Sequence, residues 1–380
     1  MIERKVFETE HDMFRDSVRK FLEAEAVPFH EQWEKDGQVD RAVWRKAGEQ
    51  GLLVPTAPEE YGGVGVDFRY NTVVTEEVSR LGLSGLGFAL HSDISVPYIL
   101  NYGTPAQKQK YIPGCVSGDI ITAIAMTEPG TGSDLQGIKT TAVLDGDHYI
   151  VNGSKTFITN GQHSDVVVVV VKTDPNAGAS GTSLLLIEAG TPGFEKGANL
   201  KKLGLKAQDT SELFFNDVRV PKENLLGEEG KGFIYLMEEL SQERLSIALI
   251  GIAATESILL QTIDYVKERK AFGKPIAAFQ NTQFQLAEMD TRVTSARVFI
   301  DRCLELHIEG KLDAVTAAKA KLLSSELQGE VIDQCLQFFG GYGYMLEYPV
   351  ARAYADARIQ RIYGGTSEIM KLIIGRSLTE

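Results

Sequence analysis

Residues 143–153 read VLDGDHYIVNG, and residues 165–172 read DVVVVVVK. The first stretch alternates apolar and polar residues around Asp145-Gly146-Asp147, which is typical of a β-hairpin. The second is a short apolar run rich in β-branched residues, and it indicates a strand buried on both faces. We expect further strands at 182–188 and 211–220. A β-rich segment therefore occupies the middle third of the 380-residue chain.

The sequence on both sides of this segment has a helical pattern. Before it, apolar residues recur at spacings of three and four, as in Phe14, Val18, Phe21 and Leu22, and again around 73–81 and 96–102. After Gly227–Phe233 (GEEGKGF), long amphipathic patterns cover 233–268, 280–310 and 312–339, and a last one begins at Thr366. We predict a mainly α protein with three domains: N-terminal helices at 1–122, a β domain at 123–228 and a helical bundle at 229–380.

The composition excludes several classes of protein. The chain has 39 Lys plus Arg against 52 Asp plus Glu, a net charge of -13, which argues against nucleic-acid binding. Its three cysteines are far apart, so neither a disulfide framework nor a zinc site is indicated, and a reducing compartment fits. The N-terminus resembles neither a signal nor a transit peptide, and we expect no run of apolar residues to approach the length that spans a membrane. We expect a cytoplasmic protein, or a mitochondrial matrix protein if this is a processed eukaryotic chain, without membrane insertion or a metal site.

Residues 241–251, SQERLSIALIG, place two charges on an apolar helix face. Glu243 lies seven residues after Leu236 and four before Ile247, on the stripe that should be buried. Arg244 lies on the adjoining edge of the same face. An ion pair involving Glu243 would explain the charges structurally, although adjacent helical residues point about 100° apart and pair poorly. The alternative is a functional carboxylate.

Five further stretches combine glycine with polar or aromatic residues. They are TEPGTGSD (127–134), KTFITNG (155–161), RKAFGKPIAAFQ (269–280), QFFGGYGYMLEYP (337–349) and IYGGTSEI (362–369). In KTFITNG, strand alternation would place Phe157 and Thr159 on one face, where a planar cofactor could use both. Each stretch alone is also explained as an ordinary turn, strand or helix cap. TEPGTGSD lacks the third glycine of a Rossmann fingerprint.

The order of these five motifs along one chain resembles the acyl-CoA dehydrogenase family. The resemblance covers essentially the whole length and is greatest to the long-chain branch, through GFALHSDISVPYILNYG, AMTEPGTGSDLQGIKT, KLGLKAQDT and QERL. It implies an N-terminal helical domain, a β-barrel or sandwich middle domain and a C-terminal four-helix bundle. It also implies that the protein binds FAD without a Rossmann fold.

One departure from the family pattern identifies the expected base. Many relatives carry their catalytic glutamate directly after the tyrosine of IYGGTSEI, where this chain has Gly364. In the long-chain and isovaleryl branches the base comes from the first helix of the C-terminal domain, and the matching residue is Glu243. Burial should raise the pKa of that carboxyl from about 4.3 by about a unit or more. The backbone N–H of Gly364 would still stabilise the thioester oxygen, together with a flavin hydroxyl.

The resemblance also implies the remaining site residues. Cofactor contacts from the same chain would come from Met126, Thr127, Gly132, Ser133, Phe157, Thr159, Thr366 and Glu368. A neighbouring subunit of a homotetramer would contribute Arg269, Phe272, Gln280, Gln337, Gly340 and Gly341. Substrate contacts would come from Ser133, Arg244, Tyr363, Gly364 and Gly365.

The implied reaction is oxidation of a medium- to long-chain acyl-CoA to the trans-2-enoyl-CoA in fatty acid β-oxidation, with electrons passed to an electron-transferring flavoprotein. Two alternatives remain at this point. The same scaffold could be an oxidase that uses oxygen, or a catalytically silent relative that acts as a scaffold or assembly partner.

Overall fold

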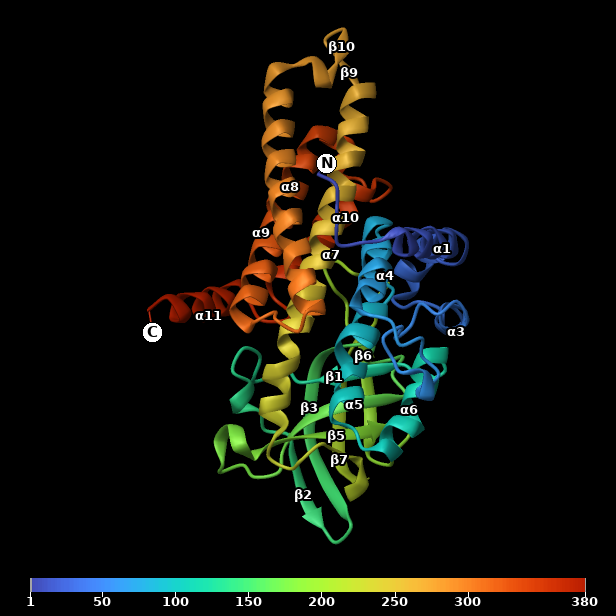
Figure 1. Cartoon of the computed structure of the whole chain (residues 1–380), viewed down its shortest axis with the longest axis vertical. Helices are drawn as coiled ribbons and strands as arrows, with labels where there is room; N and C mark the ends of the chain where they lie inside the picture. The colour runs from blue at the N-terminus through green and yellow to red at the C-terminus, as the bar shows by residue number, and fades with distance from the viewer. Residues whose placement is uncertain (1, 380) are drawn as a thin grey trace.

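The computed structural model describes residues 2–379 and is elongated (Figure 1). A β-sheet forms one end, long helices form the other, and the N-terminal helices pack beside the junction. These N-terminal elements are α1 (Thr9–Glu25), α2 (Val27–Asp36), α3 (Arg41–Glu49), α4 (Phe68–Arg80), a π-helical turn (Leu90–Ser95), α5 (Val96–Tyr102) and α6 (Pro105–Ser117). The fold class expected from the sequence is confirmed.

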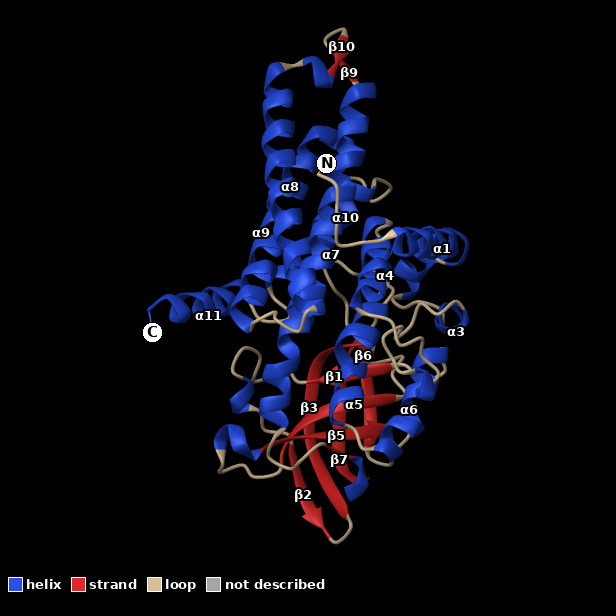
Figure 2. Cartoon of the chain, in the orientation of Figure 1, coloured by secondary structure: helices blue, strands red, loops and turns tan. Residues whose placement is uncertain are grey.

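One eight-stranded sheet forms the middle of the chain (Figure 2). Its strands are β1 (Thr122–Ala125), β2 (Thr141–Asp145), β3 (His148–Thr159), β4 (Val166–Lys172), β5 (Thr182–Glu188), β6 (Phe194–Asn199), β7 (Thr210–Pro221) and β8 (Leu225–Leu226). The order is β6-β7-β3-β2-β4-β5-β8, with β1 paired to β4. The hairpin turns at Gly146–Asp147, since Asp145 pairs with His148. The predicted hairpin is therefore confirmed.

Strand β4 joins two apolar cores. Val166, Val168 and Val170 pack into a cluster shared with the N-terminal helices. The alternate residues Val167, Val169 and Val171 pack into a second cluster, inside the curved sheet. All seven residues of β4 are buried. A strand with apolar contacts on both faces has no solvent side, which is why the sequence shows no alternation here.

The C-terminal third is helical. It contains α7 (Gly232–Glu268), α8 (Gln280–Ile308), α9 (Ala314–Phe339), α10 (Pro349–Ala357) and α11 (Ser367–Thr379). A small hairpin of β9 (Lys270–Ala271) and β10 (Lys274–Pro275) connects α7 to α8 at the far tip (Figure 1). Helix α9 begins where Asp313 accepts hydrogen bonds from the backbone N–H groups of Val315 and Thr316.

Helix α7 runs from the sheet to the tip and contacts α4, α8 and α9. The first residue of α7, Gly232, packs directly against β5. A Cβ at this position would lie 2.8 Å from the backbone of Ser183, so only glycine allows this close approach. By length and composition α7 is apolar enough to cross a membrane, with an 18-residue window of mean hydropathy 1.6. This corrects the expectation that no segment approaches that length. However, 67% of that window is buried within the protein, as in a core helix.

Three elements differ from the expectation. Strand β1 is only four residues long, β6 (FEKGAN) is half polar, and α10 is a short helix after Pro349. Their patterns are too short or too polar for periodicity to mark them. The strands at 182–188 and 211–220 and the long helices agree with the structure to within about two residues.

Candidate active site

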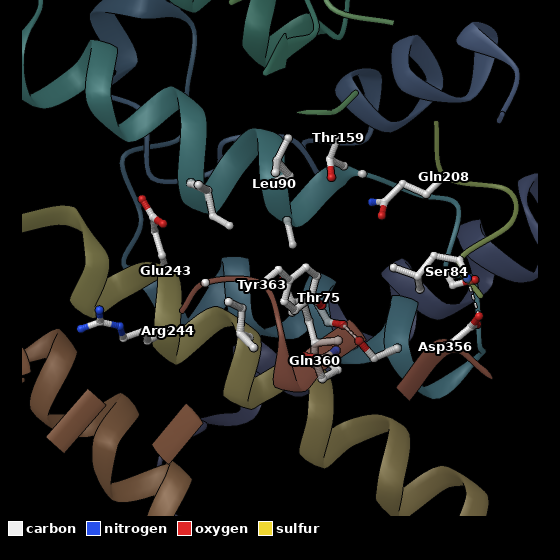
Figure 3. A pocket seen from close by; sticks show the side chains of 18 of the residues that line it. Thr75, Ser84, Leu90, Thr159, Gln208, Glu243, Arg244, Asp356, Gln360 and Tyr363 are labelled. Carbon is white, nitrogen blue, oxygen red and sulfur yellow. Dashed lines mark hydrogen bonds between the residues drawn. The ribbon is translucent and has the colours of Figure 1, made fainter. Parts of the chain in front are cut away.

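A cavity of about 690 Å³ lies where the three parts of the chain meet. Its walls come from α4, the π-helical turn, the end of β3, α7, and the loop between α10 and α11. Figure 3 shows Glu243 and Arg244 at one end of the cavity, Ser84 and Asp356 at the other, and Tyr363 between them. Of the residues predicted to form the site, it brings together Met126, Thr127, Gly132, Ser133, Phe157, Thr159, Glu243, Arg244, Tyr363, Gly364 and Gly365.

Glu243 is a buried carboxylate in the cavity wall. Its residue is 5% exposed, and the Tyr98 hydroxyl donates a hydrogen bond of 2.8 Å to Oε1. Burial raises the pKa of Glu243 from 4.5 to about 7. The Tyr98 hydrogen bond and the charge of Arg244 lower this pKa, while the charge of Glu239 raises it, and burial has the largest effect. A carboxyl group with a pKa near 7 suits a general base at neutral pH.

Arg244 lies beside Glu243 without pairing to it. The residue is 5% exposed, and within residues 2–379 its Nε has no hydrogen-bond partner. Burial lowers the pKa of Arg244. No direct Glu243–Arg244 ion pair occurs within 4.0 Å among the described residues, so the structure does not show the pairing that would explain both charges structurally. An unpaired buried guanidinium at a cavity wall is available to an anionic ligand.

The loop Tyr363–Gly365 crosses the cavity beside α7. Gly364 has φ +62°, and a Cβ there would lie 2.2 Å from Cδ1 of Ile247. A side chain at 364 is therefore disfavoured both by backbone conformation and by the side chain one helical turn after Glu243. The side chain of Ile247 fills the space that a side chain at position 364 would need.

Lys321 of α9 holds this loop from behind. Its side chain is fully buried, and Nζ donates a hydrogen bond of 2.6 Å to the Gly365 carbonyl. Burial, together with the charge of Arg244, lowers the pKa of Lys321 to about 8. The bond holds the Gly365–Thr366 peptide and so restrains the loop that contains Gly364, whose N–H is the expected donor to a thioester oxygen.

A buried ion pair between Lys155 and Glu128 stabilises the loop at 127–134, which forms another part of the cavity wall. Lys155 Nζ lies 2.9 Å from Glu128 Oε1 and donates to the Met126 carbonyl at 3.0 Å. The Glu128 carboxylate also accepts from the backbone N–H groups of Lys139 and Thr140. These bonds close the TEPGTGSD segment into a defined loop, with its exposed turn at Gly130 and Gly132 toward open space.

Phe157 lines the cavity with little cover. It is 68% exposed and has φ +60°, a conformation that is strained for a residue with a side chain. The register of β3 against β7 shifts between Lys155 and Ile158, so regular alternation ends before Phe157. Phe157 and Thr159 both line the cavity as expected, but a β-bulge rather than strand alternation places them there.

Eight predicted cofactor residues do not line the cavity. Thr366 Oγ1 accepts from Ile369 N at 3.3 Å at the start of α11, and Glu368 is exposed. The other six lie next to the β9–β10 hairpin, or at the end of α9 and just after it, where Tyr342 contacts Arg269: Arg269, Phe272, Gln280, Gln337, Gly340 and Gly341. Phe272 is 96% exposed with φ +51°. None of these six residues lines the cavity of its own chain.

Four residues around the site were missed from the sequence. Tyr98, Lys321 and the Lys155–Glu128 pair contact the predicted residues across large sequence separations, 145 residues for Tyr98 and Glu243. Their partners are not visible in local spacing. The available signal was a lysine among apolar positions, Lys155 in KTFITNG and Lys321 in α9. An unpaired lysine is rarely fully buried, so each of them indicates a partner.

The cavity fits a planar, polar cofactor. Phe157 offers an uncovered ring, and within residues 2–379 the walls contain partnerless buried polar atoms of Arg244, Gln328 and Gln360. Such atoms are costly unless a ligand or water satisfies them. A buried carboxylate near neutral pKa, an uncovered aromatic ring and a glycine loop around one cavity agree with the class that the sequence resemblance implies, a flavin-dependent oxidoreductase.

Comparison with known proteins agrees with this class. The acyl-CoA dehydrogenase N-terminal, middle and C-terminal domain models match residues 8–119, 123–218 and 230–379. The chain is 54% identical over 377 residues to the mitochondrial long-chain specific acyl-CoA dehydrogenase of Rattus norvegicus, covering 99% of this chain and 88% of the relative. This protein therefore belongs to the acyl-CoA dehydrogenase family.

Two solved structures extend the comparison. An acyl-CoA dehydrogenase from Geobacillus kaustophilus matches with a TM-score of 0.98 and 53% identity, over 100% of both chains. A Bacillus anthracis acyl-CoA dehydrogenase complexed with FAD matches with a TM-score of 0.93 and 33% identity, over 98% of this chain and 67% of that one. The family consists of FAD-dependent oxidoreductases that act on acyl-CoA.

Proposed function

We propose that this enzyme oxidises medium- to long-chain acyl-CoA thioesters to trans-2-enoyl-CoA, with Glu243 as the catalytic base. The observation that carries the proposal is one carboxylate, buried in the cavity wall, with a pKa of about 7. An acid that is half ionised at neutral pH can accept a proton there and release it again.

In this mechanism, Glu243 accepts the proton from carbon 2 of the thioester. The N–H of Gly364 donates to the thioester oxygen as negative charge develops, and Lys321 restrains the same loop through the carbonyl of the next residue, Gly365. FAD, when bound, supplies the acceptor for the hydride that leaves carbon 3. The C2–H and C3–H bonds break and a C2–C3 double bond forms.

The residues that would hold FAD come from two copies of the chain. Met126, Thr127, Gly132, Ser133, Phe157 and Thr159 lie on the cavity, whereas the six tip residues do not line it. We infer that a neighbouring subunit supplies the tip, in a homotetramer, and that Thr366 and Glu368 complete the contacts. An Arg269→Ala variant should lose FAD on gel filtration, as measured by absorbance at the flavin bands, while retaining its helical circular dichroism.

The acyl chain would extend from Glu243 along α4, past Val74, Val78 and Leu81. Arg244 and Ser133 would face the CoA portion. A ladder of acyl-CoA substrates from short to very long, straight and branched, tests this assignment. Activity that peaks at short chains would contradict the medium- to long-chain proposal.

The electron acceptor is proposed to be an electron-transferring flavoprotein. An assay in air without another acceptor distinguishes this from an oxidase, which would turn over and form hydrogen peroxide. A purified protein that binds no flavin would instead support a silent scaffold. We also infer domain boundaries at 122/123 and 228/229, and a location in the cytoplasm, or in the mitochondrial matrix for a processed eukaryotic chain; the relative from rat is named as mitochondrial.

A further inference from the structure

Helix α5 presents three polar side chains to the acidic face of α7. Tyr98 donates to Glu243 Oε1 at 2.8 Å, Asn101 Nδ2 donates to Glu239 Oε1 at 2.7 Å, and Tyr102 donates to Glu238 Oε2 at 2.8 Å. Each acid therefore has its own donor. The bonds differ in burial, because Tyr98 and Glu243 are buried whereas Glu238 is exposed.

The hydrogen bond from Tyr98 makes the two carboxylate oxygens of Glu243 different. Oε1 is occupied by the phenol, and no donor to Oε2 is present within residues 2–379. Tyr98 is buried and does not line the cavity. Its exposed fraction is 0%, and it is absent from the residues of the cavity wall. A rigid, buried phenol fixes the rotation of the carboxylate better than water would.

We propose that Tyr98 is a positioning residue for Glu243, which holds Oε1 and leaves Oε2 as the oxygen that takes the substrate proton. This inference rests on the proposed role of Glu243 as the base. Tyr98 touches neither substrate nor cofactor in this arrangement, and acts through the carboxylate alone.

Other ionisable groups around Glu243 have separate partners. Glu239 on α7 accepts from Asn101, and Asp93 of the π-helical turn accepts from Asn71, Thr75 and Ser246. Lys321 of α9 donates to Gly365. Arg244 is the remaining neighbour and donates no hydrogen bond to Glu243 among the described residues. Removing the Tyr98 hydroxyl therefore leaves the ionised carboxylate without its hydrogen-bond donor.

The test is the pH profile of kcat/KM for the holoenzyme with Tyr98→Phe, which keeps the ring and removes only the hydroxyl. Hydrogen bonds to an ionised group favour its charged form, so the pKa of the base should rise by about one unit. At pH 6 kcat/KM should fall about tenfold from this ionisation effect. Any loss that persists above pH 9 reports poorer orientation of Oε2.

Tyr102→Phe is the matched control, since it removes the same hydroxyl one turn later on the same helix, and its profile should superimpose on that of the wild type. A second readout needs no turnover: infrared titration of the protonated carboxyl band that disappears in Glu243→Gln. Its midpoint should rise in Tyr98→Phe and stay unchanged in Tyr102→Phe.

The outcomes separate the two proposals. If Glu243→Gln retains normal activity, the assignment of the base fails. If Glu243→Gln is inactive but Tyr98→Phe matches the wild type in both its pH profile and its infrared midpoint, the assignment of the base stands and the role of Tyr98 is overturned.

Discussion

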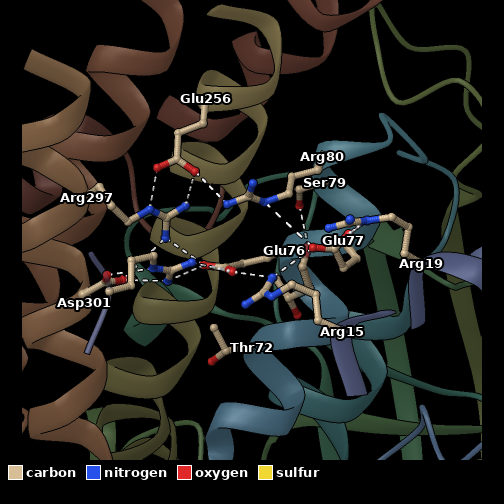
Figure 4. A network of polar contacts seen from close by, with 12 residues as sticks. Arg15, Arg19, Thr72, Glu76, Glu77, Ser79, Arg80, Glu256, Arg297 and Asp301 are labelled. Atoms are coloured by element: carbon tan, nitrogen blue, oxygen red, sulfur yellow. Dashed lines mark hydrogen bonds and ion pairs between the residues drawn. The ribbon is translucent and has the colours of Figure 1, made fainter. Parts of the chain in front are cut away.

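Two buried glutamates of this enzyme have opposite surroundings. Glu76 of α4 is 0% exposed and forms ion pairs with Arg4, Arg15 and Arg297 (Figure 4). Glu243 of α7 is 5% exposed and has one neutral donor, Tyr98. Burial alone would raise both pKa values. At Glu76 the arginine charges and hydrogen bonds outweigh burial and hold the pKa well below 4.5, whereas at Glu243 burial prevails and the pKa rises to about 7.

The comparison shows that compensation by cations, rather than burial, decides whether the pKa of a buried acid is lowered or raised. The cluster around Glu76 also contains Glu77, Arg80, Glu256 and Asp301, and it joins the N-terminal segment, α1, α4, α7 and α8 (Figure 4). It therefore fixes α4 against α7, which form two walls of the cavity. Protonation does not stabilise a buried acid whose charge is fully compensated by cations, but it does stabilise a buried acid that lacks such partners.

The largest expected effect is on activity. Glu243→Gln should lower kcat by about 10²–10⁴-fold, the usual contribution of a general base. The matched control is Glu239→Gln, a buried acid one turn earlier that does not line the cavity and should keep most of the activity. Flavin absorbance verifies that both variants retain FAD. Equal losses in the two variants would mean that α7 needs its charges for structure rather than for catalysis.

The next effect is on stability. Glu76→Gln should lower the free energy of unfolding by about 3–5 kcal/mol, because it leaves arginines buried without their partner. Urea denaturation measures this. The kcat of the molecules that remain folded should change little. A Glu76→Gln variant as stable as the wild type would show that the network is dispensable.

The two variants should also respond to pH in opposite directions. The folded pKa of Glu243 is raised, so its ionisation weakens the fold as pH rises from 4.5 to about 7, by up to about 3 kcal/mol. Glu243→Gln should therefore gain stability relative to the wild type across this window and hold the gain above it. The folded pKa of Glu76 is lowered, so its contribution is full above 4.5 and is lost on acidification. Urea midpoints from pH 5 to 8 should rise relative to the wild type for Glu243→Gln only.

A smaller effect is expected at the loop beside Gly364. Lys321→Met keeps the length of the side chain but removes its hydrogen bond to the Gly365 carbonyl, so kcat should fall by about tenfold, roughly the value of one charged hydrogen bond. KM for the acyl-CoA should change less than kcat if the Gly364 N–H acts mainly on the negative charge that develops on the thioester oxygen. A rise in KM alone would assign Lys321 to substrate binding.

The sequence predicted those features whose cause is local. The hairpin at Gly146–Asp147, the buried strand β4 and the bounds of α7 follow from turn chemistry and periodicity. The burial of Glu243 could be predicted because a helical pattern assigns each residue to a face. Periodicity does not say which element packs on that face, so Tyr98 of α5 was not predicted.

Other features depended on conformation that the sequence does not display. The β-bulge that turns Phe157 into the cavity interrupts an otherwise regular strand pattern. The clash that a side chain at 364 would meet comes from Ile247, 117 positions earlier in the chain. The six tip residues were assigned to a neighbouring subunit through family resemblance, and that assignment stays a prediction.

The most direct test of the account is exchange of the α-proton. An acyl-CoA with sulfur in place of carbon 3 keeps its protons at carbon 2 but has no hydride to give, so deuterium uptake from D₂O reports proton removal alone. In the FAD-loaded wild type, the uptake rate should rise with pH around a pKa of about 7, and in Glu243→Gln it should fall at least a hundredfold. Uptake at the wild-type rate in Glu243→Gln would contradict the account.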